Sequence, residues 1–127
     1  MNLQQSKTMP ETEGNILCTE ARGLVTYEYY VDIYLARLEK IIQEFGKARL
    51  LFFYPDPDNF KGWEKTAADV DFSKFNEYSQ YIEKVALINP PKSVSQRWDF
   101  RMPILSGEFR EFEKVEDLAE ALEWIRA

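Results

Sequence analysis

A nearly unbroken run of hydrophobic residues, 48–54, lies near the middle of the chain and contains only Arg49 as a charged residue. The run is too short to form a stable helix, because a helix must first offset the cost of its nucleating turn. It also ends at two prolines, Pro55 and Pro57. A strand buried on both faces explains this pattern, and such a strand lies in the middle of a sheet that helices cover.

A polar turn follows this predicted central strand and leads into Phe60-Lys61-Gly62-Trp63. Ligands of open α/β sheets tend to bind beside the loops at the carboxyl ends of central strands, so we place the candidate site here. Gly62 is expected to adopt a backbone conformation closed to other residues. Phe60, Trp63 and Phe72 are expected to form a local aromatic cluster, which either caps the core or borders a hydrophobic cleft.

Residues 26–45 have the pattern of an amphipathic helix that packs on a sheet. Thr26 is the predicted N-cap, and Gly46 is the predicted stop. The tyrosines of the hydrophobic stripe favour a role in core packing over a role as the wall of a ligand site. The stripe consists of Tyr27, Val31, Tyr34, Leu38, Ile41 and Phe45.

The rest of the chain continues an alternation of strands and helices. Residues 64–81 are predicted to be at least partly helical, with Asp71 or Ser73 as the N-cap of a second piece, and residues 1–14 form a tail or an edge strand. Alternation of this kind predicts one α/β domain, covering 15–127, with parallel strands joined by right-handed crossovers. The other predicted strands are 15–22, 82–89 and 107–112, and the other predicted helices are 93–101 and 115–126.

Composition narrows the class of function. The 127 residues are 45% hydrophobic and 15% aromatic, which is enough to build a core in a single domain. The net charge of −6 disfavours nucleic acid as a partner, because nucleic-acid binding needs clustered lysine and arginine.

The chain contains no histidine, which excludes Ser-His and Cys-His nucleophiles and most zinc sites. The single cysteine, Cys18, excludes an intramolecular disulfide and is expected to be an unreactive core residue. We therefore expect no catalytic residue, no bound metal and no cofactor. No segment reaches the length of a signal peptide or of a membrane span, so a cytoplasmic protein is expected.

Two motifs around the central strand carry a resemblance to a known family. Gly46-Lys47-Ala48-Arg49-Leu50-Leu51 and Asp58-Asn59-Phe60-Lys61-Gly62-Trp63 resemble the SpoIIAA-like proteins of the STAS superfamily (sulphate transporter and anti-sigma factor antagonist). The resemblance covers roughly residues 15–127. It implies a mixed, mostly parallel sheet of four or five strands with about four helices, and a binding or switch module that is not an enzyme.

In the anti-sigma antagonist branch of that superfamily, a phosphorylated serine in the corresponding loop controls binding to a partner, because it adds negative charge to an interface. Residues 55–65 contain no serine or threonine, so this sequence departs from that pattern. The SpoIIAA-like branch is also associated with apolar ligands and with membranes. The resemblance therefore implies a protein partner or a lipid-like ligand, with contact to a membrane surface as one option.

A second aromatic-rich segment, 98–105, is expected to face the predicted turn across a cleft. Aromatic and methionine side chains next to arginines suit a partner surface or an apolar ligand with an anionic group, which Arg97 or Arg101 would orient. The residues predicted to bind are Phe60, Gly62, Trp63, Arg97, Trp98, Arg101 and Met102.

Two alternatives remain open at this point. Asp56 and Asp58 flank Pro57 and suit a small carboxylate-dependent enzyme or a divalent-metal site. The same residue types are also what a tight turn requires for its own geometry, and we favour that interpretation. In the second alternative, the segment 98–105 pairs with a second copy of the chain in a structural homodimer.

Overall fold

The predicted central strand is β4 (Ala48–Phe53), which lies in the middle of a five-stranded sheet in the computed structural model. The structure describes residues 5–127. The strand order is β1-β2-β4-β6-β7; β1 pairs antiparallel to β2, and all the other neighbours are parallel. The α/β fold that the alternation of elements predicts is therefore confirmed, as is the mixed, mostly parallel sheet that the resemblance implies. The other strands are β1 (Lys7–Thr8), β2 (Ile16–Glu20), β6 (Ile82–Ile88) and β7 (Glu108–Phe112).

The predicted N-terminal tail, 1–14, lies partly outside the described residues, because the structure describes none of residues 1–4. The remainder contributes β1 at the edge of the sheet, where Lys7 pairs with Glu20 and Thr8 with Thr19. Ser6 then joins this edge to the chain beyond β2, since its hydroxyl both donates to the carbonyl and accepts from the N–H of Arg22.

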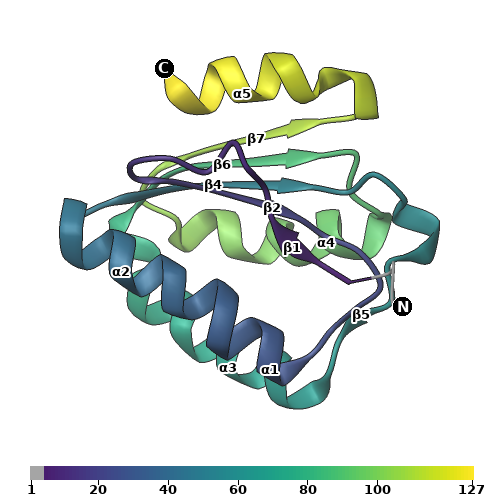
Figure 1. Ribbon diagram of the computed structural model, residues 1–127, viewed down its shortest axis with the longest axis horizontal. Helices are drawn as coiled ribbons and strands as arrows, with labels where there is room; N and C mark the ends of the chain where they lie inside the picture. The colour runs from purple at the N-terminus through teal and green to yellow at the C-terminus, as the bar shows by residue number, and fades with distance from the viewer. Residues whose placement is uncertain (1–4) are drawn as a thin grey trace.

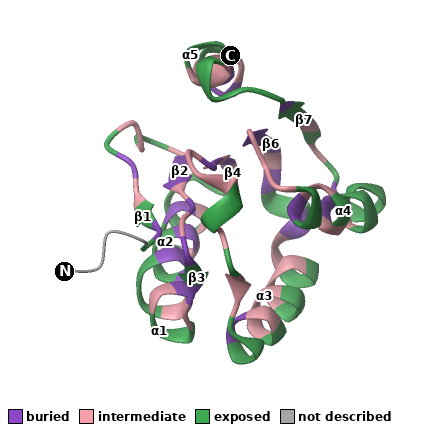
Figure 2. Ribbon diagram, turned by 90° about the vertical axis from the view of Figure 1, so that its right-hand side faces the viewer, coloured by how far each residue is buried: buried purple, intermediate pink, exposed green. Residues whose placement is uncertain are grey.

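In the described part of the chain, four helices cover the two faces of the sheet (Figure 1). One face carries α5 (Leu118–Arg126), which Figure 2 shows standing apart from the other helices. The opposite face carries α3 (Lys65–Tyr78), α4 (Lys92–Arg101) and a continuous first helix. That first helix consists of α1 (Tyr27–Tyr29), a π-helical stretch (Tyr30–Leu35) and α2 (Ala36–Phe45).

Both predicted ends of the first helix are confirmed. The Thr26 hydroxyl accepts a hydrogen bond from the Tyr29 N–H, and Gly46 ends the helix with a φ of 72°. The expectation that Tyr27 and Phe45 face the core is wrong, because their side chains are 44% and 47% exposed. The π-helical stretch inserts an i→i+5 turn, which displaces Tyr27 from the stripe, and Phe45 lies in the last turn, where the chain leaves the sheet.

The region 64–81, which the sequence left open, contains one uninterrupted helix, α3, from Lys65 to Tyr78. The prediction that Asp71 or Ser73 caps a second piece is wrong, since both residues lie in the middle of α3. A polar residue interrupts a helix only where its side chain takes over the hydrogen bonds of the helix backbone. The Asp71 carboxylate instead accepts hydrogen bonds from other helices.

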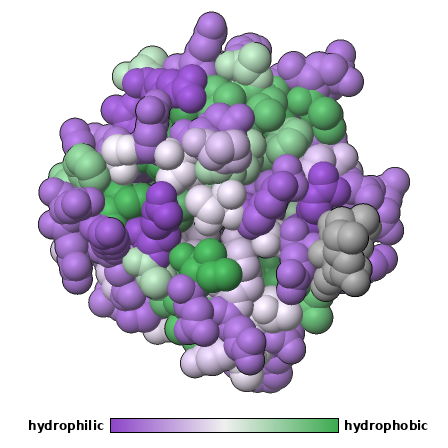
Figure 3. All heavy atoms as spheres, in the orientation of Figure 1, coloured by the Kyte–Doolittle hydropathy of each residue, from purple (hydrophilic) through white to green (hydrophobic). Residues whose placement is uncertain are grey.

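The alternating faces of the central strands separate two hydrophobic cores. Leu51 and Ala86 pack with α5 residues such as Ile125, whereas Leu50 and Val85 pack beneath the three helices of the opposite face. On the surface shown in Figure 3, hydrophobic residues gather just beneath α5, and most of the remaining surface is hydrophilic. The α5 face is thus closed by one helix, and the opposite face has the more complex packing.

Gly107 lies where β7 begins beside β6. A Cβ atom at this position would lie 2.3 Å from the backbone oxygen of Glu83 and 2.4 Å from that of Ile82. Such distances are far below van der Waals contact, and backbone atoms cannot move aside as a side chain does. The close approach of the two strands therefore requires glycine here.

We predict that Gly107→Ala lowers the free energy of unfolding by about 2–3 kcal/mol, because the added methyl group forces the two strands apart. Urea denaturation followed by circular dichroism measures this loss. Glu108→Ala is the control, since its side chain is exposed and its loss is expected to stay within about 0.5 kcal/mol. A loss for Gly107→Ala no larger than that of the control would contradict the prediction.

Candidate functional site

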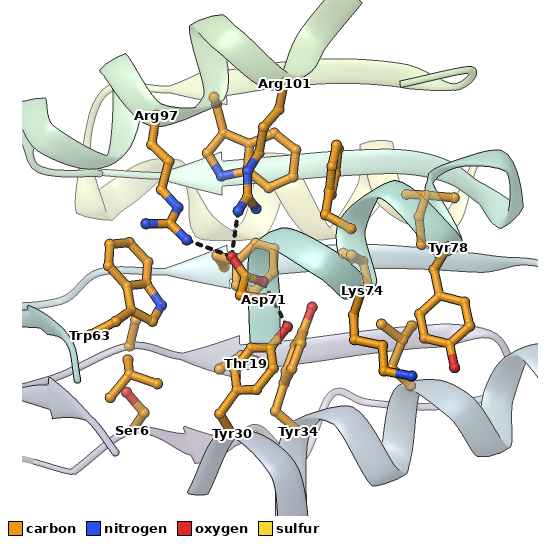
Figure 4. Close-up of a pocket in the computed structure, with 18 of the residues that line it drawn as sticks. Ser6, Thr19, Tyr30, Tyr34, Trp63, Asp71, Lys74, Tyr78, Arg97 and Arg101 are labelled. Carbon is orange, nitrogen blue, oxygen red and sulfur yellow. Dashed lines mark hydrogen bonds and ion pairs between the residues drawn. The ribbon is translucent and has the colours of Figure 1, made fainter. Parts of the chain in front are cut away.

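A cavity of about 80 Å³ lies between the sheet and the helices that cover the face opposite α5 (Figure 4). Its floor includes Thr19 of β2 and Leu50 and Phe52 of β4, and its walls come from the first helix, α3, α4 and the turn after β4. A water molecule needs about 10–15 Å³ of such space, so the cavity has room for several waters or for a compact ligand.

The predicted turn reaches this cavity through a short strand that the sequence did not indicate. β5 (Gly62–Trp63) pairs in parallel with β3 (Leu24–Val25), and the Lys61 N–H donates to the Gly23 carbonyl over 2.7 Å. Gly62 has a φ of 85°, as the sequence led us to expect. This pairing fixes Trp63 in the wall of the cavity.

Aromatic rings line the same wall. Phe60 packs edge-on against Tyr54 and Trp63, with ring centroids 5.2 Å and 5.3 Å apart. Phe72 does not join them, because its side chain is 68% exposed. The predicted aromatic cluster therefore contains Phe60 and Trp63, and its inclusion of Phe72 is wrong. Edge-to-face packing of this kind holds rings rigidly and keeps the wall apolar.

Asp71 is the charged centre of the cavity. Its Oδ2 accepts hydrogen bonds from Nη2 of Arg97 over 2.7 Å and from Nη2 of Arg101, and its Oδ1 accepts one from the Tyr30 hydroxyl over 2.7 Å. Figure 4 shows both arginines reaching from α4 toward this carboxylate. One buried side chain of α3 thus joins the first helix to α4.

The environment of Asp71 keeps it ionised. Burial alone would raise the pKa of the Asp71 carboxyl, but Arg101, the Tyr30 hydroxyl and Arg97 together hold that pKa below its usual value. The cluster then contains two guanidinium groups and one carboxylate, which leaves one surplus positive charge.

The two arginines also stack on aromatic rings. The guanidinium carbon of Arg97 lies 4.1 Å from the ring centroid of Trp63, and that of Arg101 lies 4.7 Å from the centroid of Phe75 and 5.4 Å from that of Trp98. The Nε atom of Arg97 is buried and has no hydrogen-bond partner among the side chains and backbone of 5–127. The cavity therefore offers an unused donor on a cationic group.

Two tyrosines from the π-helical stretch complete the wall. Tyr30 and Tyr34 are 5% and 8% exposed, and burial raises the pKa of both phenols well above the ordinary value. Both rings pack in the core, as the sequence predicted, and both also line the cavity. π-helical stretches are often found at functional sites, although no sequence rule locates them.

Sequence reasoning missed Asp71 as a site residue, yet a signal existed. Asp71 shares a helix face with Ala67, Phe75 and Tyr78 at spacings of four, four and three, and Ala67 is fully buried. A carboxylate on the apolar face of a helix requires a buried partner. Arg97 and Arg101 are themselves four residues apart on one face of α4, which is the matching signal on the other side.

The structure brings five of the seven predicted binding residues to the cavity, and leaves two outside it. Gly62 shapes the turn without lining the cavity, and Met102 lies in a 3₁₀ turn (Met102–Ile104) with its side chain 43% exposed. Trp98 is both a core residue and a wall residue, since it is 5% exposed. The five residues in the cavity wall are Phe60, Trp63, Arg97, Trp98 and Arg101.

The alternative carboxylate pair lies away from the cavity. Asp56 accepts a hydrogen bond from the Asn59 side-chain amide over 2.7 Å, which closes the turn at Pro57–Asn59, and Asp58 is exposed. Within residues 5–127, no group of three or more histidine, cysteine, aspartate or glutamate side chains is placed to hold a metal ion. Cys18 is buried, and its surroundings, chiefly burial and then Glu11, raise the pKa of the thiol to about 12.

Comparison with known proteins places the chain in a family. The sequence pattern of the SpoIIAA-like family matches residues 16–126. The chain belongs to the SpoIIAA-like family. Its fold is similar to the crystal structure of an uncharacterized protein from the DUF3478 family, which has a SpoIIAA-like fold and comes from Shewanella loihica PV-4. The TM-score is 0.70 at 24% identity, over 98% of this chain and 97% of that one.

The comparison with curated proteins found no match to the chain. The comparisons therefore give this SpoIIAA-like domain its family and its fold and no specific activity. Of the helices in the part of the chain that the structure describes, none is long and apolar enough to cross a membrane.

The SpoIIAA-like domain has a second notable surface outside the cavity. A groove between α3 and the end of α4 exposes large hydrophobic side chains, among them Phe72 and Phe100, which is 85% exposed. Ile104 from the 3₁₀ turn borders the same groove and is 51% exposed. Exposed apolar side chains that gather in one place often mark an interaction surface.

We predict that Asp71→Asn lowers the free energy of unfolding near neutral pH by about 3 kcal/mol, because it leaves two partly buried arginines without their counter-charge. The folded-state pKa of Asp71 is lowered, so its stabilisation is present above the unfolded pKa of about 4 and is lost as pH falls through the lower folded value. The difference between wild type and variant should therefore shrink below about pH 4.

Denaturation by urea at several pH values measures this dependence. Asp69→Asn is the control on the same helix, since Asp69 is exposed and forms only an i,i+4 ion pair with Lys65 at 3.0 Å. Its effect is expected to stay below about 0.5 kcal/mol. Equal losses for the two variants, or a difference between wild type and Asp71→Asn that does not change with pH, would contradict the assigned role of Asp71.

Proposed function

We propose that this SpoIIAA-like domain is a non-enzymatic binding module whose cavity takes an apolar ligand with an anionic group. The observation that carries the proposal is the combination of aromatic walls with a buried charge cluster that has one surplus positive charge. Apolar pockets with a few convergent polar groups are typical ligand sites. The ring of Trp63 would contact the apolar part of such a ligand, and the guanidinium of Arg97 would bind its anionic group.

The charge of the cluster supports an anion in particular. The chain as a whole has a net charge of −6, whereas this partly buried cluster carries a net positive charge. The unused Nε donor of Arg97 offers a charge-assisted hydrogen bond to a carboxylate or a similar group. A bound anion would neutralise the surplus charge, which is costly to keep away from water.

The protonation states in and around the cavity support binding rather than chemistry. Burial raises the pKa of Tyr34 and of Tyr54, so both phenols stay neutral, while Asp71 stays ionised between its arginines. The thiol of Cys18, with its pKa near 12, lies in the core on the α5 side of the sheet. A general acid or base works best with a pKa near the operating pH, and these groups lie far from it.

We predict that the protein binds hexanoate or phenylacetate more tightly than the corresponding neutral amides, and that Arg97→Gln weakens the binding of the acids about tenfold to a hundredfold. The loss corresponds to one charge-assisted hydrogen bond, about 1.5–3 kcal/mol. Isothermal titration calorimetry of the purified protein measures both comparisons.

Arg110→Gln is the matched control, because Arg110 is a half-exposed residue of β7 that pairs with Glu120 at 3.7 Å. This control should bind the acids as the wild type does. Circular dichroism and thermal unfolding establish that both variants fold. If the acids bind no better than the amides, or if Arg97→Gln leaves their affinity unchanged, the anionic site is not where we propose it.

A second candidate function is self-association through the groove between α3 and α4. Phe72 and Phe100 are 68% and 85% exposed, which is unusual for phenylalanine in a chain with a well-filled core. Charged residues, Asp69 and Arg101 among them, border the apolar surface of the groove, and a polar rim around an apolar centre is the common arrangement of protein interfaces.

If two copies meet at this groove, light scattering across a concentration series should show a dimer of the wild type, and Phe100→Asp should remain a monomer at every concentration. The expected change follows from placing a charge at the centre of an apolar contact. Phe45→Asp, which alters an exposed phenylalanine at the end of α2, serves as the control and should still form the dimer. A monomeric wild type would exclude this candidate.

A further inference from the structure

Two buried hydroxyl groups in the cavity have no assigned role. Thr19 lies on β2 with its side chain facing the cavity, and it is 4% exposed. Its Oγ1 has no hydrogen-bond partner among the described residues, 5–127. The hydroxyl of Tyr29, from α1, is likewise buried in the cavity wall and finds no partner in that part of the chain.

An unpaired buried hydroxyl destabilises the fold, because it has lost its hydrogen bonds to water and gained none in return. Valine would fill the same volume as Thr19 on a strand and would carry no such cost. Burial raises the pKa of Tyr29 to about 12, and the neighbouring Thr19 hydroxyl opposes that rise although the two oxygens do not meet in hydrogen-bond geometry. The two groups therefore form a neutral polar pair that can donate to or accept from a third molecule.

This polar pair and the cationic cluster lie on different walls. Tyr29 belongs to the first helix and Thr19 to the sheet. Arg97 and Arg101 extend from α4 (Figure 4). A ligand that engages the guanidinium of Arg97 and also reaches the hydroxyls contacts the sheet, the first helix and α4 at once. It then carries two polar groups, one for each set of partners.

The walls between these polar ends are made mainly of rings. The rings of Tyr30 and Tyr34 lie 5.3 Å apart, Tyr34 and Phe52 lie 5.9 Å apart, and Phe52 and Trp98 lie 6.3 Å apart. Such tilted ring contacts favour another flat ring over a flexible chain. The cavity volume of about 80 Å³ also favours a compact ligand, since pockets for drug-sized molecules usually measure about 300 Å³ or more.

We infer that the ligand is a compact aromatic acid with a hydrogen-bonding group at the end opposite its carboxylate. The carboxylate binds Arg97, the ring lies among the aromatic walls, and the second polar group pairs with the hydroxyls of Thr19 and Tyr29. This assignment rests on the proposed function and adds to it the chemical class of the ligand.

The test compares matched acids with and without a para-hydroxyl group. The pairs are para-hydroxybenzoate and benzoate, para-hydroxyphenylacetate and phenylacetate, and the two corresponding phenylpropanoates, so that three lengths are sampled. Calorimetric titration of the full chain should show, for at least one pair, binding about three- to tenfold tighter for the hydroxylated acid, as one net hydrogen bond gives.

The double variant Thr19→Val/Tyr29→Phe should abolish this preference while it keeps the affinity for the unsubstituted acid. Both substitutions preserve shape, and circular dichroism with thermal unfolding verifies the fold. Ser106→Ala is the control, because its hydroxyl lies outside the cavity and donates to the Ser79 carbonyl over 3.2 Å. This control should retain the preference of the wild type.

The outcomes separate the two proposals. Equal affinity within every pair, a preference that survives in the double variant, or binding of hexanoate without binding of any aromatic acid would each overturn the inferred ligand class and leave the proposed anionic site intact. Failure of the aromatic acids and of hexanoate alike would overturn the inference together with the proposed function.

Discussion

The hydrogen-bonded carboxylate of Asp71 is the constraint on which the helical face of the domain depends. It binds Tyr30 of the first helix and both arginines of α4, while it belongs to α3 itself. A buried carboxylate is tolerated only with such partners, because the charge has been removed from water. Three helices are therefore held at one charged point, and the cavity is the space that this arrangement leaves above the sheet.

The two faces of the sheet are secured in different ways. On the α5 side, Arg49 donates to the carbonyl of Ile125 and Lys84 to that of Trp124, each over 2.8 Å. These cations satisfy carbonyls at the end of a helix, where no intrahelical donor remains and where the helix dipole favours positive charge. One helix is thus fastened directly to two central strands. On the opposite face, no strand side chain within residues 5–127 forms an equivalent hydrogen bond to a helix, and that face is closed instead by the Asp71 cluster and by aromatic rings.

The sequence predicted the sheet better than it predicted the cavity, for a physical reason. Strands such as β4 follow from a local pattern, a short apolar run that ends at prolines, and their parallel direction follows from the alternation of strands and helices. Trp63 was also identified, because it follows the central strand, and Arg97, because it lies beside an aromatic-rich segment. The pairing of Asp71 with Arg97 joins residues far apart in the chain, and its local signal, a carboxylate on the apolar face of α3, looked instead like a helix cap.

The same cluster sets the conditions under which a ligand is accepted. Arg97 already gives one Nη donor to Asp71, so an anion that binds its Nε need not displace the structural contact. Arg97 is also stacked on Trp63, which limits the freedom that its side chain must lose on binding. An anion at this point would balance the second guanidinium without disturbing the first helix or α3. The arrangement that stabilises the fold is therefore compatible with an occupied cavity. Asp71 neutralises one guanidinium group, and a bound anion would neutralise the other.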